Sequence, residues 1–128
     1  MVSNNFKRIV LIGSGSVAST LAKVLYNSGH EILEVVSRNL ANAENLAQQV
    51  HAKRVMDDFS RVTQYANLYI IAVSDDAIEN VVQQLPNVNG LVVHTSGSVD
   101  SSVLKSKFKN WGVFYPLQTF TKGRELDF

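Results

Sequence analysis

A glycine-rich turn near the start of the chain limits the folds open to this sequence more than any other feature. It follows the continuous apolar block Ile9–Ile12, which has the length of a buried strand, and precedes a segment in which apolar residues recur at helical spacing. The turn fits the pattern G-x-G-x-x-G/A with Gly13, Ser14, Gly15, Ser16, Val17 and Ala18. A strand, a glycine turn and a helix in this order predict the first βα unit of a doubly wound α/β fold with a parallel sheet.

The rest of the chain repeats this alternation of short apolar runs and helical segments. Further strands are expected at 31–37, 53–56, 68–73, 91–95 and 111–115, and helices at 40–50, 75–85 and 98–107. Gly29 is expected to end the first helix, Asp57 or Asp58 to cap a short helix leading to Tyr65, and Pro86 to follow the helix that starts near 75. Six strands with right-handed crossovers predict a three-layer Rossmann sheet in the order 3-2-1-4-5-6, formed by residues 1–128 as one domain.

Composition excludes several classes of function. The 128 residues carry a formal charge of +1, so they offer no basic field for nucleic acid or for an anionic membrane. No apolar stretch approaches the roughly 20 residues of a membrane-spanning helix, and the polar start at 1–8 does not resemble a signal peptide. The chain has no cysteine, which excludes disulfides and thiolate chemistry. We expect a soluble cytoplasmic protein with no nucleic acid, membrane or metal as a partner.

The residue types in the turn suit a bound diphosphate. Gly13 lets the chain bend sharply off the strand, Gly15 lacks the Cβ that would hold a pyrophosphate away, and Ala18 lets the helix pack closely on the strand. The N–H groups and the positive dipole at the start of the helix favour an anion. A tight turn with two glycines and no ligand is the simpler alternative, but the strands and helices on both sides favour a dinucleotide.

The end of the second expected strand indicates which dinucleotide is bound. NAD-binding domains usually place an acidic residue there, to bind the ribose 2′-hydroxyl. This chain has Ser37, Arg38 and Asn39 instead. Arg38 can form a charge-assisted fork with a 2′-phosphate and lie against adenine, which favours NADP(H) over NAD(H); the alternative is a solvated surface arginine. Glu34 is followed by two apolar residues and is expected to lie short of the strand end.

Five segments together carry a resemblance to a known family: 13–18, 37–38, 71–78, 94–98 and 114–120. The chain resembles the Rossmann-like NADP oxidoreductases, akin to coenzyme F420-dependent NADP reductases and pyrroline-5-carboxylate reductases. More narrowly, it looks like an uncharacterised bacterial branch in which such a domain precedes a helical C-terminal domain of unknown function. The resemblance implies that the ribose and nicotinamide are bordered by Ala72, Val73 and Ser74, and that three residues lie beside the ring: His94, Thr95 and Ser96.

The resemblance also implies that the substrate-binding or dimerisation domain is absent from this chain. That domain or a partner subunit would close the site, and the full-length protein would be a possible homodimer. Residues 1–128 alone could then bind cofactor without turning over a small-molecule substrate, and the segment 111–120 would contact the missing part.

His94 is the candidate catalytic residue on this side of the sheet. Hydride transfer to a carbonyl or imine requires a proton donor, and an imidazole can supply a proton near neutral pH. The alternative is a partly buried histidine bonded to a neighbouring loop. Asp75 and Asp76 are expected to cap a helix, and His30 and His51 to lie on the surface at helix ends.

The sequence therefore favours an NADP(H)-binding domain of an oxidoreductase that transfers a hydride between the nicotinamide and a small carbonyl or imine. A nucleotide-binding regulatory module without catalysis is an alternative. A methyltransferase that uses S-adenosylmethionine is a second, but such enzymes usually have an acid at the end of the second strand, where this chain has Ser37 and Arg38.

Overall fold

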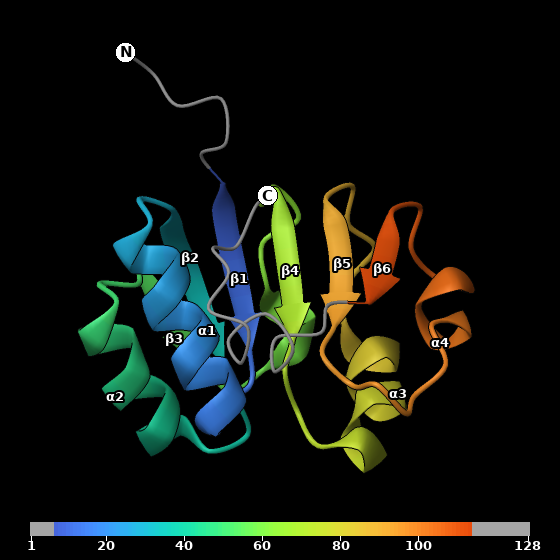
Figure 1. Ribbon diagram of the computed structural model, residues 1–128, viewed down its shortest axis with the longest axis horizontal. Coiled ribbons are helices and arrows are strands. Elements are labelled where there is room, and N and C mark those ends of the chain that lie inside the picture. The colour runs from blue at the N-terminus through green and yellow to red at the C-terminus, as the bar shows by residue number, and fades with distance from the viewer. Residues whose placement is uncertain (1–6, 114–128) are drawn as a thin grey trace.

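The computed structural model describes residues 7–113, which form a parallel sheet of six strands in the order β3-β2-β1-β4-β5-β6 (Figure 1). This order confirms the predicted Rossmann topology. The strands are β1 (Arg8–Ile12), β2 (Glu31–Val36), β3 (Arg54–Met56), β4 (Leu68–Ile71), β5 (Leu91–His94) and β6 (Trp111–Val113). The expected extension of β6 to 115, and the segment 114–120 of the family resemblance, lie outside the described residues.

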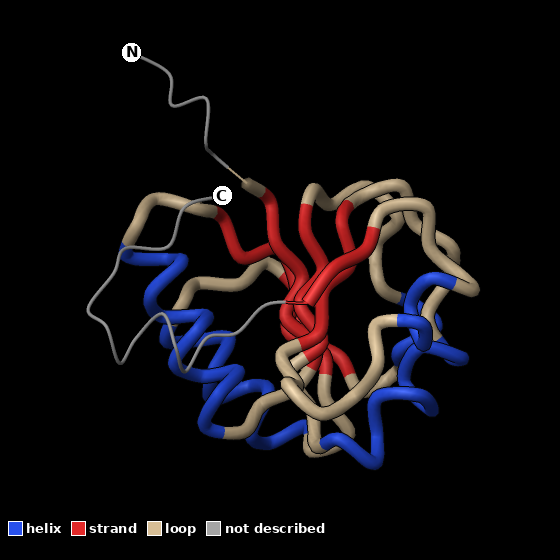
Figure 2. Tube along the Cα trace, turned by 45° about the vertical axis from the view of Figure 1, so that its right-hand side comes forward, coloured by secondary structure: helices blue, strands red, loops and turns tan. Residues whose placement is uncertain are grey.

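Helices cover both faces of the sheet and complete the three layers (Figure 2). One face carries α1 (Ser16–Asn27) and α2 (Leu40–Gln49). The other carries α3 (Asp75–Gln84), the short α4 (Ser102–Lys105) and the single 3₁₀ turn η1 (Phe59–Arg61). No helix within residues 7–113 has both the length and the apolar character needed to cross a membrane.

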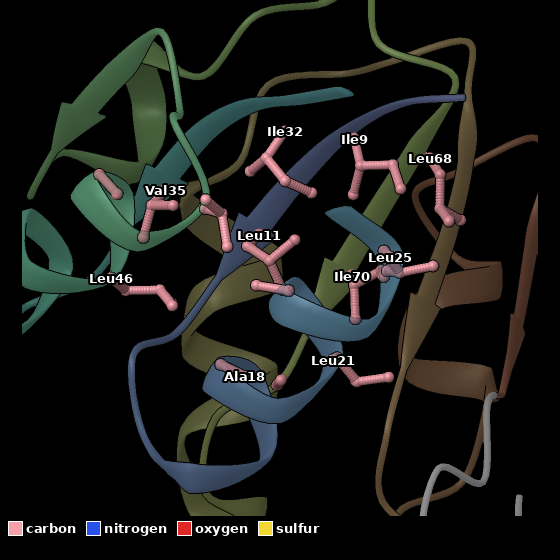
Figure 3. Close-up of a cluster of buried hydrophobic side chains, with 14 of the residues drawn as sticks. Ile9, Leu11, Ala18, Leu21, Leu25, Ile32, Val35, Leu46, Leu68 and Ile70 are labelled. Atoms are coloured by element: carbon pink, nitrogen blue, oxygen red, sulfur yellow. The ribbon is translucent and has the colours of Figure 1, made fainter. Parts of the chain in front are cut away.

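β1 is buried on both faces, as its unbroken apolar block predicts. Ile9 and Leu11 pack in the core beneath α1 and α2, whereas Val10 and Ile12 pack in the core beneath α3 and α4. All four are fully buried, because successive side chains of a strand point to opposite faces. Figure 3 shows the first of these cores, with the strand residues meeting one face of α1; the labelled members include Ile9, Leu11, Leu21, Leu25, Ile32 and Ile70.

The sequence predicted correctly where two helices end, but it predicted two other helices to be longer than they are. Gly29 has φ +96° immediately after the C-cap of α1, which confirms its left-handed position, and α3 ends just before Leu85 and Pro86 as expected. The helix expected over 98–107 is shorter, because the hydroxyl of Ser96 accepts hydrogen bonds from the N–H groups of Ser98 and Val99 and holds that segment as a loop. The short helix expected to reach Tyr65 is only the turn η1, capped by Asp58.

Glu34 lies in the interior of the sheet and not where β2 ends. It pairs with Val10 in the strand register, two residues before β2 ends at Val36, and its side chain is 2% exposed. One carboxylate oxygen accepts the N–H of Thr63 at 2.9 Å, and the other lies 3.1 Å from Nη1 of Arg54. The prediction that Glu34 lies short of the strand end is therefore confirmed.

Two histidines are buried, each accepting one backbone N–H at its Nδ1. His30 accepts from Lys7 at 3.0 Å, and His94 accepts from Ser96 at 3.1 Å. The expectation that His30 lies on the surface is wrong, because the chain turns inward after Gly29 to begin β2. Removal from water is the main cause that lowers the pKa of both rings: the charge of Lys7 adds to this effect at His30, while Asp75 opposes it at His94.

We predict that the stability of the domain falls as the pH is lowered from 7.5 to 5.5. Between the unfolded histidine pKa of about 6.5 and the lower folded values, the unfolded chain binds more protons, so acidification favours unfolding. Above about pH 6.5 both rings are neutral in the folded and in the unfolded chain, so their titration no longer lowers the stability. Carboxylates with lowered pKa, such as Asp58 and Asp75, lose their contribution only below about 3.8.

This pH dependence is measured as the thermal midpoint in buffers of constant ionic strength. His30→Gln and His94→Gln should each flatten the slope, whereas His51→Gln, at an exposed position, serves as the control. A parent midpoint that stays constant between pH 7.5 and 5.5 would contradict the prediction.

The backbone of Gly13, at the end of β1, lies very close to the backbone of Ala72 at the end of β4. We predict that Gly13→Ala destabilises the fold. Gly13 has φ +122°, and a Cβ there would lie 2.2 Å from the carbonyl oxygen of Ala72. Because the clash is with backbone and the conformation is strained for any other residue, the cost should be roughly 3 kcal/mol or more. Chemical denaturation measures it. A variant within about 0.5 kcal/mol of the parent would show that the turn is not constrained in this way.

Candidate dinucleotide-binding site

The carboxyl ends of β1, β2 and β4 meet at one edge of the sheet, where the arrowheads point downward in Figure 1. The loops that leave these strands surround an open pocket of about 280 Å³. Most of the predicted cofactor residues line it together with three that the sequence did not suggest. The lining residues are Gly13, Ser14, Gly15, Ser37, Arg38, Phe59, Ala72, Val73, Ser74, Ala77 and Val81.

The remaining predicted residues lie around this pocket without lining it. Ser16 faces a neighbouring groove between α1 and α2, and the side chain of Val17 is exposed on α1. Asn39 caps α2 by accepting the N–H of Asn42 at 3.0 Å. Thr95 and Ser96 follow β5, on the far side of β4 from the glycine turn.

Gly15 faces open space at the start of α1. No heavy atom of the described residues, its chain neighbours aside, lies within 4 Å of the position that a Cβ would take there. Its φ of −78° is one that any residue adopts, so the backbone conformation does not require a glycine. A Cβ would instead project into open space. The absence of a side chain leaves room for a ligand to approach the backbone.

The start of α1 carries unsatisfied donors and no negative charge. The first helical hydrogen bond runs from the N–H of Ser19 to the carbonyl of Gly15, so the N–H groups of Ser16, Val17 and Ala18 precede it. No side chain caps this end, and the first turn contains no acidic residue. Free N–H groups and the positive end of the helix dipole together make this end suitable for an anion.

Ser14 and Ser37 tie the glycine turn to the end of β2. Their hydroxyl oxygens are 2.7 Å apart, and Oγ of Ser37 also accepts the N–H of Asn39 at 3.2 Å. Ser37 is buried in this arrangement. The pair therefore holds the start of α1 and the segment that carries Arg38 at a fixed separation.

Arg38 reaches from the end of β2 to α3. Its Nη2 donates to Oδ1 of Asn80 at 2.8 Å, although the two residues are 42 positions apart in the chain. None of the ion pairs among the described residues involves Arg38. The guanidinium charge is thus held at the pocket without an acidic partner that would cancel it.

One wall of the pocket is apolar. Phe59 of η1 and Val81 of α3 are almost completely buried, and Ala77 lies one turn before Val81. Sequence reasoning missed these three residues. The spacing of Ala77 and Val81 indicates one face of a helix, but only the packing of α3 against η1 shows that this face borders the pocket.

The polar groups after β5 are bonded mainly to one another. His94 is fully buried at the end of β5, and because its Nδ1 accepts an N–H, the neutral ring carries its proton on Nε2. Nε2 has no hydrogen-bond partner among the described side chains and backbone. The lowered pKa favours this neutral form, which is a much weaker acid than imidazolium. The role of His94 as proton donor stays a prediction.

Asp75 joins α3 to this loop. Its Oδ2 accepts the hydroxyl of Ser98 at 2.6 Å, and bonds from the hydroxyls of Ser98 and Ser96 are the main causes that lower its pKa. The expectation that Asp75 or Asp76 caps α3 is wrong in detail, because the N-cap is Ser74 and both acids lie in the first turn. A carboxylate in that turn still favours the helix through its dipole.

Comparisons with known proteins agree with this geometry. The model of the family described as NADP oxidoreductase, coenzyme F420-dependent, matches residues 8–96. A glycerol-3-phosphate dehydrogenase (NAD(P)+) of Macrococcus caseolyticus is 27% identical over 112 residues, which cover 77% of this chain and 34% of that protein. A glutamyl-tRNA reductase of Listeria welshimeri is 33% identical over 79 residues, 61% of this chain and 18% of that protein.

Solved structures of similar proteins share the fold of this chain. The structure described as NADP oxidoreductase BF3122 from Bacteroides fragilis is 39% identical with a TM-score of 0.79, and the match covers 98% of this chain and 49% of that one. Pyrroline-5-carboxylate reductase from Streptococcus pyogenes is 21% identical with a TM-score of 0.65, covering 82% of this chain and 39% of that one, and shows the shared fold alone. The chain thus spans half or less of these relatives. Since the family match covers most of the sheet together with its glycine turn, the chain belongs to the family of NADP oxidoreductases described as coenzyme F420-dependent.

Proposed function

We propose that this chain is the NADP(H)-binding domain of an oxidoreductase that transfers a hydride between the nicotinamide and a small carbonyl or imine. The observation that carries the proposal is the open space at Gly15, in front of a helix end that has neither a cap nor an acidic residue. An anion fits this position because the N–H groups of α1 are free to donate to it. The bound cofactor would supply the hydride chemistry, and the protein its position and surroundings.

The diphosphate would lie against the backbone of Gly15 and the first turn of α1. From there the two ends of a dinucleotide must extend in opposite directions along the edge of the sheet, since the strand order reverses between β1 and β4. One end reaches Ser37 and Arg38 after β2. The other reaches the loops after β4 and β5.

Adenosine would occupy the side that Arg38 borders. The apolar wall of Phe59, Ala77 and Val81 suits a flat base, and a guanidinium plane can lie against adenine. A 2′-phosphate would meet Arg38, whose fork of donors matches a phosphate and whose charge no acid cancels. NADP(H) is therefore favoured over NAD(H), in which this phosphate is absent.

The nicotinamide would lie beside Ala72, Val73 and Ser74, with Thr95 and Ser96 on the next loop. His94 is the proposed proton donor on this side. In the described conformation it would have to donate from the neutral ring through Nε2, the atom that lacks a partner within residues 7–113. A wall that excludes water is also needed, and we propose that a C-terminal domain or a partner subunit, as in a homodimer, supplies it.

We predict that Gly15→Ala weakens NADPH binding about tenfold or more while the thermal midpoint stays close to that of the parent. The added methyl group finds open space in the free protein but occupies the approach of the diphosphate. Tenfold corresponds to about 1.4 kcal/mol, which is modest for pushing a charged group away from its donors. Isothermal titration measures the affinity. Unchanged affinity in a folded variant would place the ligand elsewhere.

We predict that the parent binds NADPH more tightly than NADH and that Arg38→Ala removes this preference. Hydrogen bonds to a charged group contribute about 1.5–3 kcal/mol, so NADPH affinity should fall roughly 10- to 150-fold, whereas NADH should lose only the smaller contribution of the guanidinium that lies against adenine. Arg38→Lys is the matched control, because it keeps the charge but loses the fork and should give an intermediate value. Equal affinity of the parent for both cofactors would remove the argument from Arg38.

An assay of NADPH absorbance in the presence of small carbonyls and imines tells a catalytic protein from one that only binds the cofactor. Oxidation of bound NADPH supports hydride transfer. Binding without oxidation, in a protein that also contains the expected C-terminal domain, supports a regulatory module instead.

A further inference from the structure

Asn80 fixes the position of Arg38 in the free protein. Its Oδ1 accepts from Nη2 of Arg38 at 2.8 Å and also from Nε2 of Gln84, one turn further along α3, at 2.6 Å. Both partners are donors, so an amide turned the other way would lose both bonds. The network therefore determines which atom of Asn80 faces the arginine. It also joins the end of β2 to α3, and both of these segments contribute residues to the pocket.

A long, exposed arginine normally loses much rotamer freedom when it binds a ligand. Asn80 already restricts that freedom, which reduces the loss that remains for binding. The restriction uses one of the nitrogens of the guanidinium and leaves N–H donors for a phosphate. Arg38 can thus be held in place and still bind a ligand.

The neutrality of Asn80 is as important as its geometry. An acid at this position would also hold Arg38, but it would cancel the charge and repel a phosphate. An amide orients the guanidinium and leaves its charge intact. The acids in the described ion pairs, Glu31 and Glu34, bind other basic residues and not Arg38.

We propose that Asn80 is a positioning residue that sets the preference for NADP(H) by holding Arg38 at the mouth of the pocket. This inference rests on the proposed function, since it assumes that Arg38 binds the 2′-phosphate. Asn80 lies on a helix after β4, far in sequence from the strand end that usually determines cofactor choice. Its effect acts through Arg38 and disappears when Arg38 is absent.

The test is a double-mutant cycle in which NADPH and NADH are titrated into the parent, Asn80→Ala, Arg38→Ala and the double variant. Asn80→Ala should weaken NADPH binding about three- to tenfold and leave NADH binding unchanged. In the Arg38→Ala background it should change neither. The exposed position on a helix, where alanine is favourable, means that the variant should fold.

Two further variants sharpen the test. Asn80→Asp should reduce NADPH affinity more than Asn80→Ala does, and the difference should shrink at high salt, because its cause is charge. Gln83→Ala is the matched control: it removes an amide from the same helix, but its residue lies in the groove between α3 and α4. It should leave both affinities unchanged.

Three results would overturn the inference. Equal losses of NADPH and NADH affinity would indicate a general effect on the pocket, and an equal effect of Asn80→Ala with and without Arg38 would show that the two residues act independently. Tighter NADPH binding in Asn80→Ala would mean that Asn80 competes with the phosphate. Failure of the proposed function is distinct, since the parent would then bind neither cofactor or bind both equally.

Discussion

The close contact between the Gly13 turn and the end of β4 is the constraint on which the rest of the site depends. The N–H of Gly13 donates to the carbonyl of Val36 in β2, and the N–H of Ala72 donates to the carbonyl of Ile12, so the chain leaves β1 wedged between both neighbours. Only a residue without Cβ fits there. The sharp bend that results directs α1 back over the sheet and leaves its first N–H groups uncapped, next to the hollow between the loops.

On the glycine-turn side of this hollow, the groups that can bind an anion have no acidic partner among the described residues. The start of α1 is uncapped and free of acids, and Arg38 lacks an acidic partner among the described residues. The other two long helices differ: Asn39 caps α2, and Asp75 and Asp76 stabilise the first turn of α3. Water can satisfy exposed donors in the free protein, so this pattern costs little stability. It does bring positive potential together at one place, where an anionic ligand gains most.

The sequence predicted the features that depend on burial and local chain direction. Strands covered on both faces must be apolar throughout, which made β1 and β4 recognisable, and the two apolar residues after Glu34 placed it correctly short of the strand end. Features that depend on contacts between distant segments were missed. Phe59 and Val81 border the pocket only because η1 and α3 pack together, and Asn80 meets Arg38 across 42 residues. The buried position of His30 likewise involves a distant segment, since its ring accepts the N–H of Lys7, 23 residues away. The loop held by Ser96 is different, because its bonds to Ser98 and Val99 are local and the sequence reasoning overlooked them.

The two halves of the site differ in how complete they are within residues 7–113. On the glycine-turn side, an arginine without an acidic partner and several apolar side chains line an open pocket, and the free N–H groups of α1 lie next to it. On the β5 side, the polar groups satisfy one another: Ser96 binds its own loop, Ser98 binds Asp75, and His94 is buried and favoured in its neutral form. Recognition of a nucleotide needs only fixed donors and shape, but transfer of a hydride needs a second reactant held in a dry site with a proton at hand. This difference supports the proposal that the chain itself selects the cofactor, while the selection of a substrate depends on groups outside these residues.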